Sequence, residues 1–190
     1  MKSVTFEVNH LKMDRGLYHA KTDITDTVAT LTFDIRLCAP YTDEPLSVEA
    51  LHTFEHVFAT ALRSIEDKVK TIYFGPMGCQ TGFYAVFQVS SKDFEPSDAI
   101  FACVDKLAKA NGIAFSMTSV PAKNEFQCGN FHTLGEMWVS REISIRLQSI
   151  LDKVLAANRL DEYQYINDED RELINGANKR VRKVLVVDLR

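Results

Sequence analysis

Residues 26–38 alternate strictly between apolar and polar side chains, and this pattern constrains the fold more than any other. The apolar set comprises Ala29, Leu31, Phe33, Ile35 and Leu37. The polar set comprises Thr30, Thr32, Asp34 and Arg36. Because successive side chains of a strand point to opposite faces of a sheet, the pattern predicts a strand that packs on a core through one face and carries polar groups on the other.

The rest of the chain mixes short strands with three longer helical patterns. Further strands are expected at residues 3–9, 70–75, 82–90, 113–119 and 184–187. Helical patterns begin at Ser47, near Ser97 and at Leu134, and the second is expected to end at Asn111 and Gly112, the third near Asn158. Because strands and helices interleave irregularly, we predict an α+β protein with a mostly antiparallel sheet packed against about three helices.

Composition narrows the class of protein. The chain has 190 residues, of which 46% are hydrophobic and 25% charged, as in an ordinary soluble globular protein of one or two domains. A net charge of -4 argues against a nucleic-acid-binding surface, and no apolar run is long enough to cross a membrane. The first residues lack the apolar stretch of a signal peptide, so we expect a cytoplasmic protein whose four cysteines are thiols.

Two histidines inside the first predicted helix suggest a metal site. His52 and His56 are separated by one helical turn, so both imidazoles can reach one ion, and Glu55 lies beside them as a proton-transfer group. A catalytic site with two histidines, one cysteine and one exchangeable water is a known pattern. Cys128 is the leading candidate for the third ligand, because Gly129 follows it in a loop where the backbone can approach closely. We therefore predict an enzyme built around one divalent metal on the central helix.

Two other interpretations of these histidines stay open at this point. His-x-x-Glu-His is also the signature of inverted zincin metallopeptidases, which would require a carboxylate as third ligand, such as Glu125 or Glu136. The ion could instead be structural and the protein not an enzyme. A closed structural site needs four protein ligands, and Cys79 could be the fourth.

Three separated motifs, at residues 50–59, 75–84 and 124–130, together resemble the S-ribosylhomocysteine lyase (LuxS) family. The resemblance extends from about residue 3 to about residue 155, and residues 33–37 resemble the strand that carries the family's substrate-binding arginine. It implies a catalytic domain at residues 1–157 and leaves residues 158–190 as a C-terminal extension of unknown role. The sequence departs from the common family pattern at Tyr73 and at Gln80, which replaces a frequent arginine.

The resemblance assigns a role to each candidate residue. It makes Glu55 and Cys79 the catalytic acid/base groups, and it makes three residues the metal ligands, namely His52, His56 and Cys128. It implies that Arg36, Thr5 and His10 bind the substrate, with His10 entering the active site of the neighbouring subunit. A cysteine acts as a base only as a thiolate, so positive charge from Arg36 or the metal is needed to depress its pKa.

The resemblance also implies a reaction and an assembly. The reaction is the metal-dependent cleavage of S-ribosylhomocysteine to homocysteine and dihydroxypentanedione, the precursor of the quorum-sensing signal autoinducer-2, by carbonyl migration and β-elimination. The implied metal is Fe²⁺, one per chain, with Zn²⁺ or Co²⁺ as substitutes. The implied assembly is a homodimer with shared active sites, without nucleic-acid or membrane partners.

Overall fold

A computed structural model describes residues 6–90, 92 and 95–187. The chain divides into two compact units, which are Met13–Glu162 on the one hand and Met1–Lys12 with Tyr163–Arg190 on the other. The first is the larger unit and the second the smaller unit. In the second unit, residues 6–12 are called the N-terminal arm and residues 163–187 the C-terminal segment. Each unit is described by itself.

The larger unit contains a four-stranded antiparallel sheet with the strand order β1-β2-β4-β3. The strands are β1 (Gly16–Thr25), β2 (Val28–Arg36), β3 (Lys70–Pro76) and β4 (Gly82–Ser90). This confirms the predicted α+β class and the strands at residues 26–38, 70–75 and 82–90. Strand β1 was not predicted, because it is an edge strand buried only at its first three residues and exposed along its second half, so it lacks apolar alternation.

Strand β2 explains why residues 26–38 alternate. Leu31, Phe33 and Ile35 are at most 1% exposed and belong to the hydrophobic core. The opposite face is not simply solvated, because Asp34 and Arg36 are also buried, at 1% and 2% exposure. A buried charge is tolerated only when it is paired, and these two side chains pair with each other (Arg36 Nη2 to Asp34 Oδ2, 2.6 Å).

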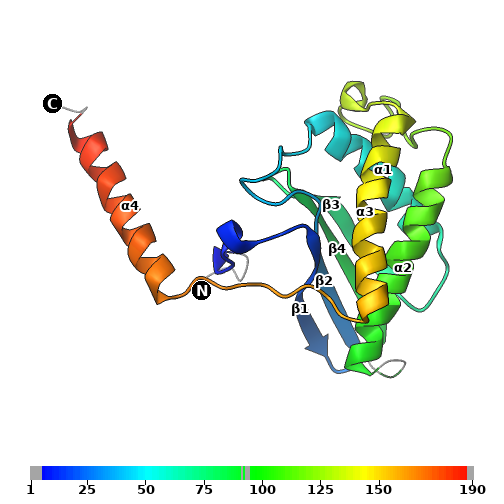
Figure 1. Ribbon diagram of the computed structural model, residues 1–190. Helices are drawn as coiled ribbons and strands as arrows, with labels where there is room; N and C mark the ends of the chain where they lie inside the picture. Colours follow the sequence, from blue (N-terminus) through cyan, green and yellow to red (C-terminus); the bar gives the residue numbers. More distant parts are fainter. Residues whose placement is uncertain (1–5, 91, 93–94, 188–190) are drawn as a thin grey trace. The chain divides into compact units, whose positions relative to one another are not determined.

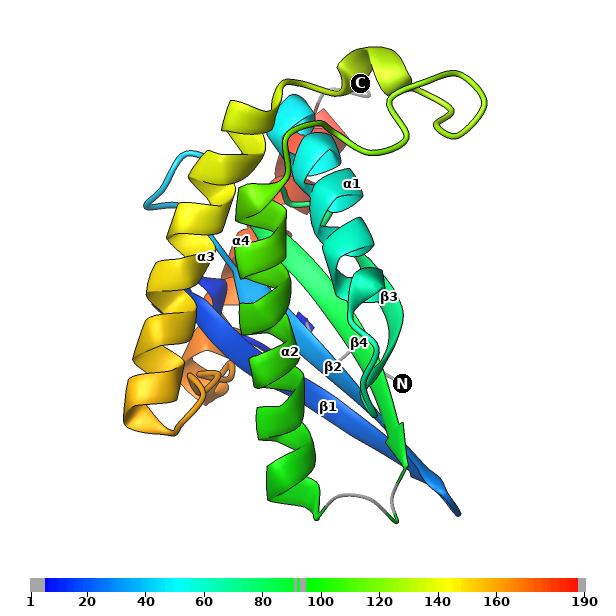
Figure 2. The ribbon, with the colours of Figure 1, turned by 90° about the vertical axis from the view of Figure 1, so that its right-hand side faces the viewer.

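Three helices, α1 (Val48–Ser64), α2 (Pro96–Ser116) and α3 (Met137–Ala157), cover one face of the sheet (Figures 1 and 2). Ser47 is the N-cap of α1, as expected, and its hydroxyl accepts a hydrogen bond from the backbone N–H of Ala50 (3.1 Å). Asn158 ends α3 in the left-handed conformation at φ 47°. Each helix packs against the other two, so the structure singles out none of them as central.

Helix α2 is longer than predicted, and the strand expected at residues 113–119 is absent from the described residues. The prediction that Gly112 ends the helix was wrong, because its φ is negative and α2 continues to Ser116. Asn111, which is 2% exposed, does not break the helix either. Its amide Nδ2 donates to the backbone carbonyl of Ser144 and to Oε1 of Gln148, both at 3.0 Å, so its N–H groups are satisfied by α3, whereas its Oδ1 is buried without a hydrogen-bond partner among the described residues.

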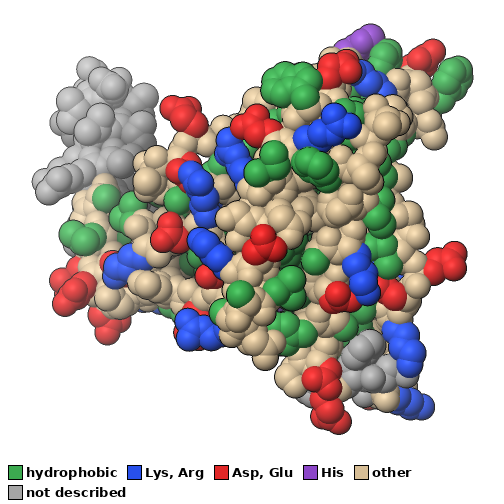
Figure 3. Space-filling view, turned by 45° about the vertical axis from the view of Figure 1, so that its right-hand side comes forward, with side chains coloured by type: hydrophobic (Ala, Val, Ile, Leu, Met, Phe, Trp, Pro, Cys, Tyr) green, Lys and Arg blue, Asp and Glu red, His purple; other side chains and the backbone are tan. Residues whose placement is uncertain are grey.

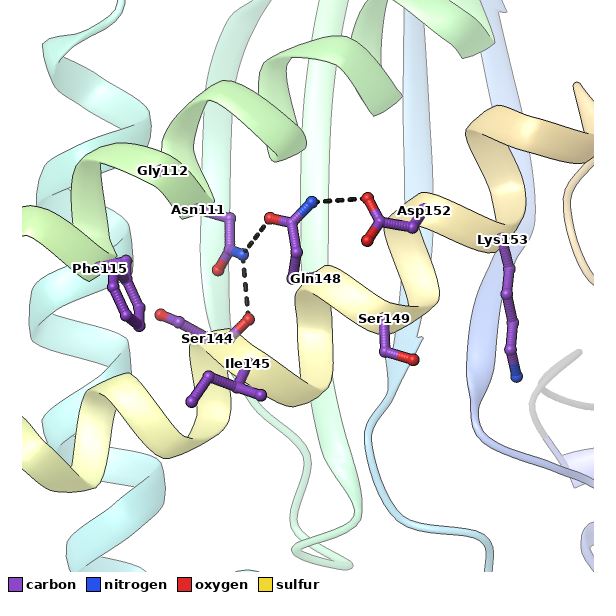
Figure 4. A pocket seen from close by; sticks show the side chains of 9 residues that line it. All are labelled: Asn111, Gly112, Phe115, Ser144, Ile145, Gln148, Ser149, Asp152 and Lys153. Atoms are coloured by element: carbon purple, nitrogen blue, oxygen red, sulfur yellow. Dashed lines mark hydrogen bonds between the residues drawn. The ribbon is translucent and has the colours of Figure 1, made fainter.

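A groove of about 670 Å³ runs between α2 and α3 above this contact (Figure 4). Phe115 and Ile145 line one end of it and Lys153 the other. At its floor, the Ser144 hydroxyl is buried and has no hydrogen-bond partner among the described residues. Asn111 is thus one polar link between the two helices, whereas the Ser144 hydroxyl contributes no bond.

The second unit differs from what the sequence predicts. The strand expected at residues 3–9 is reduced, in the part that the structure describes, to one antiparallel bridge between Val8 and Tyr165, followed by a short 3-10 helix, η2 (His10–Lys12). Residues 184–187 were expected to form a strand but belong to helix α4 (Asp168–Val187). Apolar β-branched residues favour a strand only when a neighbouring strand offers pairing, and here they continue a helix that begins well before them.

The surface of the described residues carries charges of both signs. On the face seen in Figure 3, acidic and basic side chains are interspersed among apolar and neutral ones.

Among the described helices, none combines the length and the apolar composition that a membrane span requires.

The link between α2 and α3 leads to a paired prediction. We expect Asn111→Ala to lower the free energy of unfolding by about 1–3 kcal/mol, because it removes the two hydrogen bonds that Nδ2 donates to α3, each worth about 0.5–1.5 kcal/mol. Ser144→Ala is the matched control and should leave stability within about 0.5 kcal/mol of the original protein or raise it, because no bond is lost. Urea unfolding of both variants tests this, and a larger loss for Ser144→Ala than for Asn111→Ala would contradict it.

Candidate metal centre

The two histidines of α1 and the cysteine of a distant loop meet in the structure. His52 and His56 lie one turn apart on α1, with ring centroids 4.8 Å apart and ring planes at 86°. Cys128, in the loop between α2 and α3, has its Sγ 3.4 Å from Nε2 of His52. One ligand atom from each of the three residues lies within 4.8 Å of the others. The structure therefore brings the predicted group together.

Both imidazole rings are held by hydrogen bonds on the side away from this group. Nδ1 of His52 lies 2.7 Å from the hydroxyl of Thr133, and that hydroxyl donates its proton to the carbonyl of Asn130 (2.9 Å), so His52 must donate from Nδ1. Nδ1 of His56 donates to the carbonyl of Pro121 at 2.8 Å. These bonds fix the tautomer with Nε2 as the ligand atom, as is common for metal-binding histidines. The sequence analysis did not identify Thr133 or Pro121.

The electrostatics of His52 also suit metal binding. Burial lowers the pKa of His52, the neighbouring His56 lowers it further, and the carboxylate of Glu55 raises it in part. Neutral imidazole is the form that binds a metal ion. Glu55 is half-buried on α1 between the two histidines in sequence, and its charge is close enough to act on His52.

The loop that carries Cys128 is shaped mainly by Asn124. The carbonyl of Asn124 accepts the backbone N–H of Cys128 (3.1 Å), and its side chain bonds the backbone N–H of Phe126 (3.1 Å) and Oε1 of Gln127 (2.7 Å). Gly129 is not required for a close backbone approach, because a Cβ built on it would have no atom within 4 Å. Hydrogen bonds of the Asn124 backbone and side chain, and not a glycine, therefore present Cys128 to the histidines.

The donor set fits a divalent transition metal at an open site. Two imidazole nitrogens and one thiolate match the ligands of catalytic zinc-type centres, which leave a fourth position for water or substrate. Within the described residues, the group includes neither a carboxylate nor a second cysteine. Glu125 is exposed, and Glu136 pairs with Lys123 (3.0 Å). This composition argues against both the inverted zincin and the closed structural site.

Cys79 belongs to a second cluster, together with Arg36 of β2 and Thr81. Nη1 of Arg36 donates to the hydroxyl oxygen of Thr81 (2.5 Å) and to Sγ of Cys79 (3.6 Å). The hydroxyl of Thr81 lies 3.1 Å from Sγ of Cys79. Because Arg36 already donates to the Thr81 oxygen, the Thr81 proton is available for the sulfur. Asp34 holds the rest of the guanidinium through two bonds, to Nε (3.2 Å) and Nη2 (2.6 Å).

This cluster favours the thiolate of Cys79. Partial burial raises the pKa of the Cys79 thiol, but hydrogen bonds from Thr81 and the charge and hydrogen bond of Arg36 outweigh it, so the pKa is lowered. In contrast, burial raises the pKa of Cys103 to about 12, and Cys38 is likewise buried with a raised pKa, as expected for cysteines that serve only in packing.

The sequence analysis did not identify Thr81, although the backbone gives it a defined place. Gln80 adopts a left-handed conformation (φ 61°), which turns the chain between Cys79 and Thr81. The carbonyl of Thr81 then accepts the backbone N–H groups of Leu37 (2.9 Å) and Cys38 (3.0 Å), just beyond the end of β2. The available signal in the sequence was a hydroxyl residue two positions after a candidate catalytic cysteine.

Of the two remaining predicted residues, only His10 is among the described residues, and it lies outside the larger unit. His10 is in the N-terminal arm, where its Nδ1 lies 3.0 Å from the carbonyl of Val8. Thr5 lies outside the described residues. The structure thus brings together His52, His56 and Cys128, and separately Arg36 and Cys79, whereas His10 belongs to the other unit.

Comparison with known proteins agrees with this geometry. A family model described as S-ribosylhomocysteinase (LuxS) matches residues 4–157. The chain is 32% identical over 158 residues to the S-ribosylhomocysteine lyase of Desulfotalea psychrophila, covering 83% of this chain and 96% of the relative. It is 37% identical over 131 residues to the protein of the same name from Clostridium acetobutylicum, covering 68% of this chain and 79% of the relative.

The Cys79 cluster predicts a measurable titration. The rate at which iodoacetamide alkylates Cys79 should follow the fraction of Cys79 that is thiolate. The midpoint of the rise of this rate with pH should therefore lie below the usual thiol pKa of about 8.5. Because the folded-state pKa is lowered, the reactive form is present above that midpoint and lost as the pH falls through it. Thr81→Val and Arg36→Met should each move the midpoint upward, and Thr81→Ser should restore it. An unchanged midpoint in Thr81→Val would show that the hydroxyl does not act on the sulfur.

Proposed function

Because the chain belongs to the LuxS family of S-ribosylhomocysteine lyases, we propose that it releases homocysteine and dihydroxypentanedione from S-ribosylhomocysteine. The observation that carries the proposal is the group His52, His56 and Cys128, whose ligand atoms converge within the residues that the family model matches. The reaction is that of a carbon–sulfur lyase, and its five-carbon product is the precursor of autoinducer-2.

One divalent ion per chain would be held by these three side chains. We propose Fe²⁺, with Zn²⁺ or Co²⁺ as substitutes, because all three accept imidazole and thiolate ligands. When bound, the ion supplies Lewis acidity that polarises the carbonyl of the ring-opened sugar. Thr133 and the carbonyl of Pro121 keep the two imidazoles oriented for it.

The residues of this chain then move the protons. A thioether bond on a saturated carbon is not broken directly, so the carbonyl first migrates from C1 to C3. In each step Cys79 or Glu55 removes a proton from the carbon next to the carbonyl, and a proton is returned to the former carbonyl carbon. With the ketone at C3, removal of the C4 proton lets homocysteine leave from C5 with the electrons of the carbon–sulfur bond. The lowered pKa of Cys79 supports its role as a base.

Arg36 acts beside Cys79 in this proposal. Its guanidinium is almost fully buried and bonded to Asp34 and Thr81, which keeps it rigid. The hydrogen bond to Cys79 supports a substrate contact close to the reacting carbons. A fixed cation at that position also stabilises negative charge that develops on the substrate.

We further propose a homodimer in which Thr5 and His10 of one subunit bind the amino-acid end of a substrate held by the other. The division of the chain supports this arrangement, because the arm that contains His10 is not part of the compact unit that contains the metal centre. A segment that is not packed into the compact unit of its own metal centre is available to complete the site of a second copy.

Release of homocysteine is measured with a free-thiol assay on purified protein. We expect Cys128→Ala to lose metal and activity together. Glu55→Gln should keep the metal but slow turnover by about 10²–10⁴, because an amide cannot carry protons between carbons. Glu136→Gln is the matched control, since that carboxylate pairs with Lys123 and lies outside the ligand group. Full metal occupancy in Cys128→Ala, or loss of metal in Glu136→Gln, would overturn the ligand assignment.

A mixing experiment tests the shared site. His10→Ala and Glu55→Gln chains are each expected to be weak or inactive as homodimers. A heterodimer of the two contains one site with both residues intact, so its activity should return to about half that of the original dimer. Differently tagged chains allow the heterodimer to be isolated and assayed. A heterodimer as inactive as its parents would place His10 and Glu55 in sites of the same chain.

A further inference from the structure

We propose that the C-terminal segment is a clamp that positions the N-terminal arm, and that Asp170 and Arg171 are its positioning residues. The sequence alone assigns no role to this segment. The effect on substrate binding rests on the proposed function of His10, whereas the clamp itself rests only on contacts within the smaller unit.

The clamp begins with backbone pairing. The N–H of Asn9 donates to the carbonyl of Gln164 (2.7 Å), and the N–H of Ile166 donates to the carbonyl of Glu7 (2.8 Å). Between these bonds, Val8 and Tyr165 form an antiparallel bridge. Two such short strands are marginal by themselves in water, so other contacts are needed to hold the arm in one conformation.

The first turn of α4 supplies these contacts. The Asn167 side chain accepts the N–H of Asp170 (2.8 Å), and the Asp170 carboxylate accepts the N–H of Asn167 (3.1 Å), which is a reciprocal cap of the helix. The same carboxylate accepts a hydrogen bond from the side-chain amide of Asn9 (2.8 Å) and lies 3.7 Å from Nζ of Lys12. The residue that caps α4 therefore also binds the arm.

Arg171 adds a second link one residue further on. Its Nη2 donates to the carboxylate of Glu7 at 2.6 Å, and both side chains remain partly exposed. The hydrogen bonds from the Asn167 backbone and the Asn9 side chain, with the charge of Lys12, lower the pKa of Asp170, so it stays ionised at neutral pH. Partly exposed ion pairs are individually weak, but here they act on the same residues as the backbone bonds.

The clamp acts on His10 through Val8 and Asn9. The carbonyl of Val8 accepts a hydrogen bond from Nδ1 of His10 (3.0 Å), and the side chain of Asn9 accepts the N–H of Leu11 (3.0 Å). Val8 and Asn9 are only 4% and 6% exposed. Because the residues that orient the His10 ring are those that the C-terminal segment pairs with, loosening the segment should free the ring.

The experiment uses the full chain with Asp170→Ala, Arg171→Ala and both together. Hydrogen exchange at the amides of Asn9 and Ile166 should be about tenfold faster in the double variant, because both links to the arm are lost. The KM for S-ribosylhomocysteine should rise about tenfold with kcat and metal content nearly unchanged, because a contact made equally in ground and transition state affects binding alone. In Arg171→Lys, the exchange rates and the KM should stay close to those of the original protein, in contrast to Arg171→Ala.

Glu172→Gln is the matched control, because it removes an exposed acid of the same helix that has no hydrogen bond or ion pair with the described residues of the arm. It should change neither exchange nor KM. Unchanged exchange in the double variant would overturn the clamp. Faster exchange with an unchanged KM would overturn its positioning role. If the unmodified protein released no homocysteine, the proposed function would fail, while the exchange experiment would still decide whether the clamp exists.

Discussion

The packing of helix α1 on the sheet through four phenylalanines is the interaction on which the candidate site depends. Phe54 stacks on Phe58 (4.9 Å between ring centroids), and these two rings contact Phe74 of β3 and Phe83 of β4 at 4.8–6.1 Å. Such pairs add stabilisation beyond the burial of apolar area. With this stripe turned to the sheet, His52 and His56 are left on another side of the helix, where the loop of Cys128 reaches them.

A precise ligand group also requires that the histidine rings do not rotate. Their outer nitrogens are held by Thr133 and by the carbonyl of Pro121, and both partners belong to the same connection between α2 and α3 as Cys128. One loop therefore supplies the third ligand and orients the other two. The contact of Asn111 with α3 joins the helices at the two ends of that loop. The metal centre thus depends on helix packing at some distance from it.

The Asp34–Arg36 pair shows how a buried charge can serve a site. Burying two charged groups costs free energy that their mutual attraction offsets only when the remaining hydrogen bonds are satisfied. Here the guanidinium satisfies its donors with Asp34, Thr81 and Cys79. The arrangement is rigid because each group is held by another, and it directs a fixed positive charge at the sulfur of Cys79. A solvated arginine at the same place would be screened and mobile.

The sequence by itself determined the elements whose signal is local. The alternation of residues 26–38 specified β2, Ser47 specified the start of α1, and the spacing of His52 and His56 placed two imidazoles on one side of a helix. The expected end of α2 at Gly112 was wrong, because the side-chain N–H groups of Asn111 donate to α3 and the helix continues to Ser116. Thr133, Pro121 and Thr81 could not be identified from spacing, because their roles depend on partners in other elements. Only the tertiary structure decided these contacts, and likewise the pairing of the N-terminal arm with the C-terminal segment, because a hydrogen bond between residues far apart in the chain exists only where packing has already brought their backbones together.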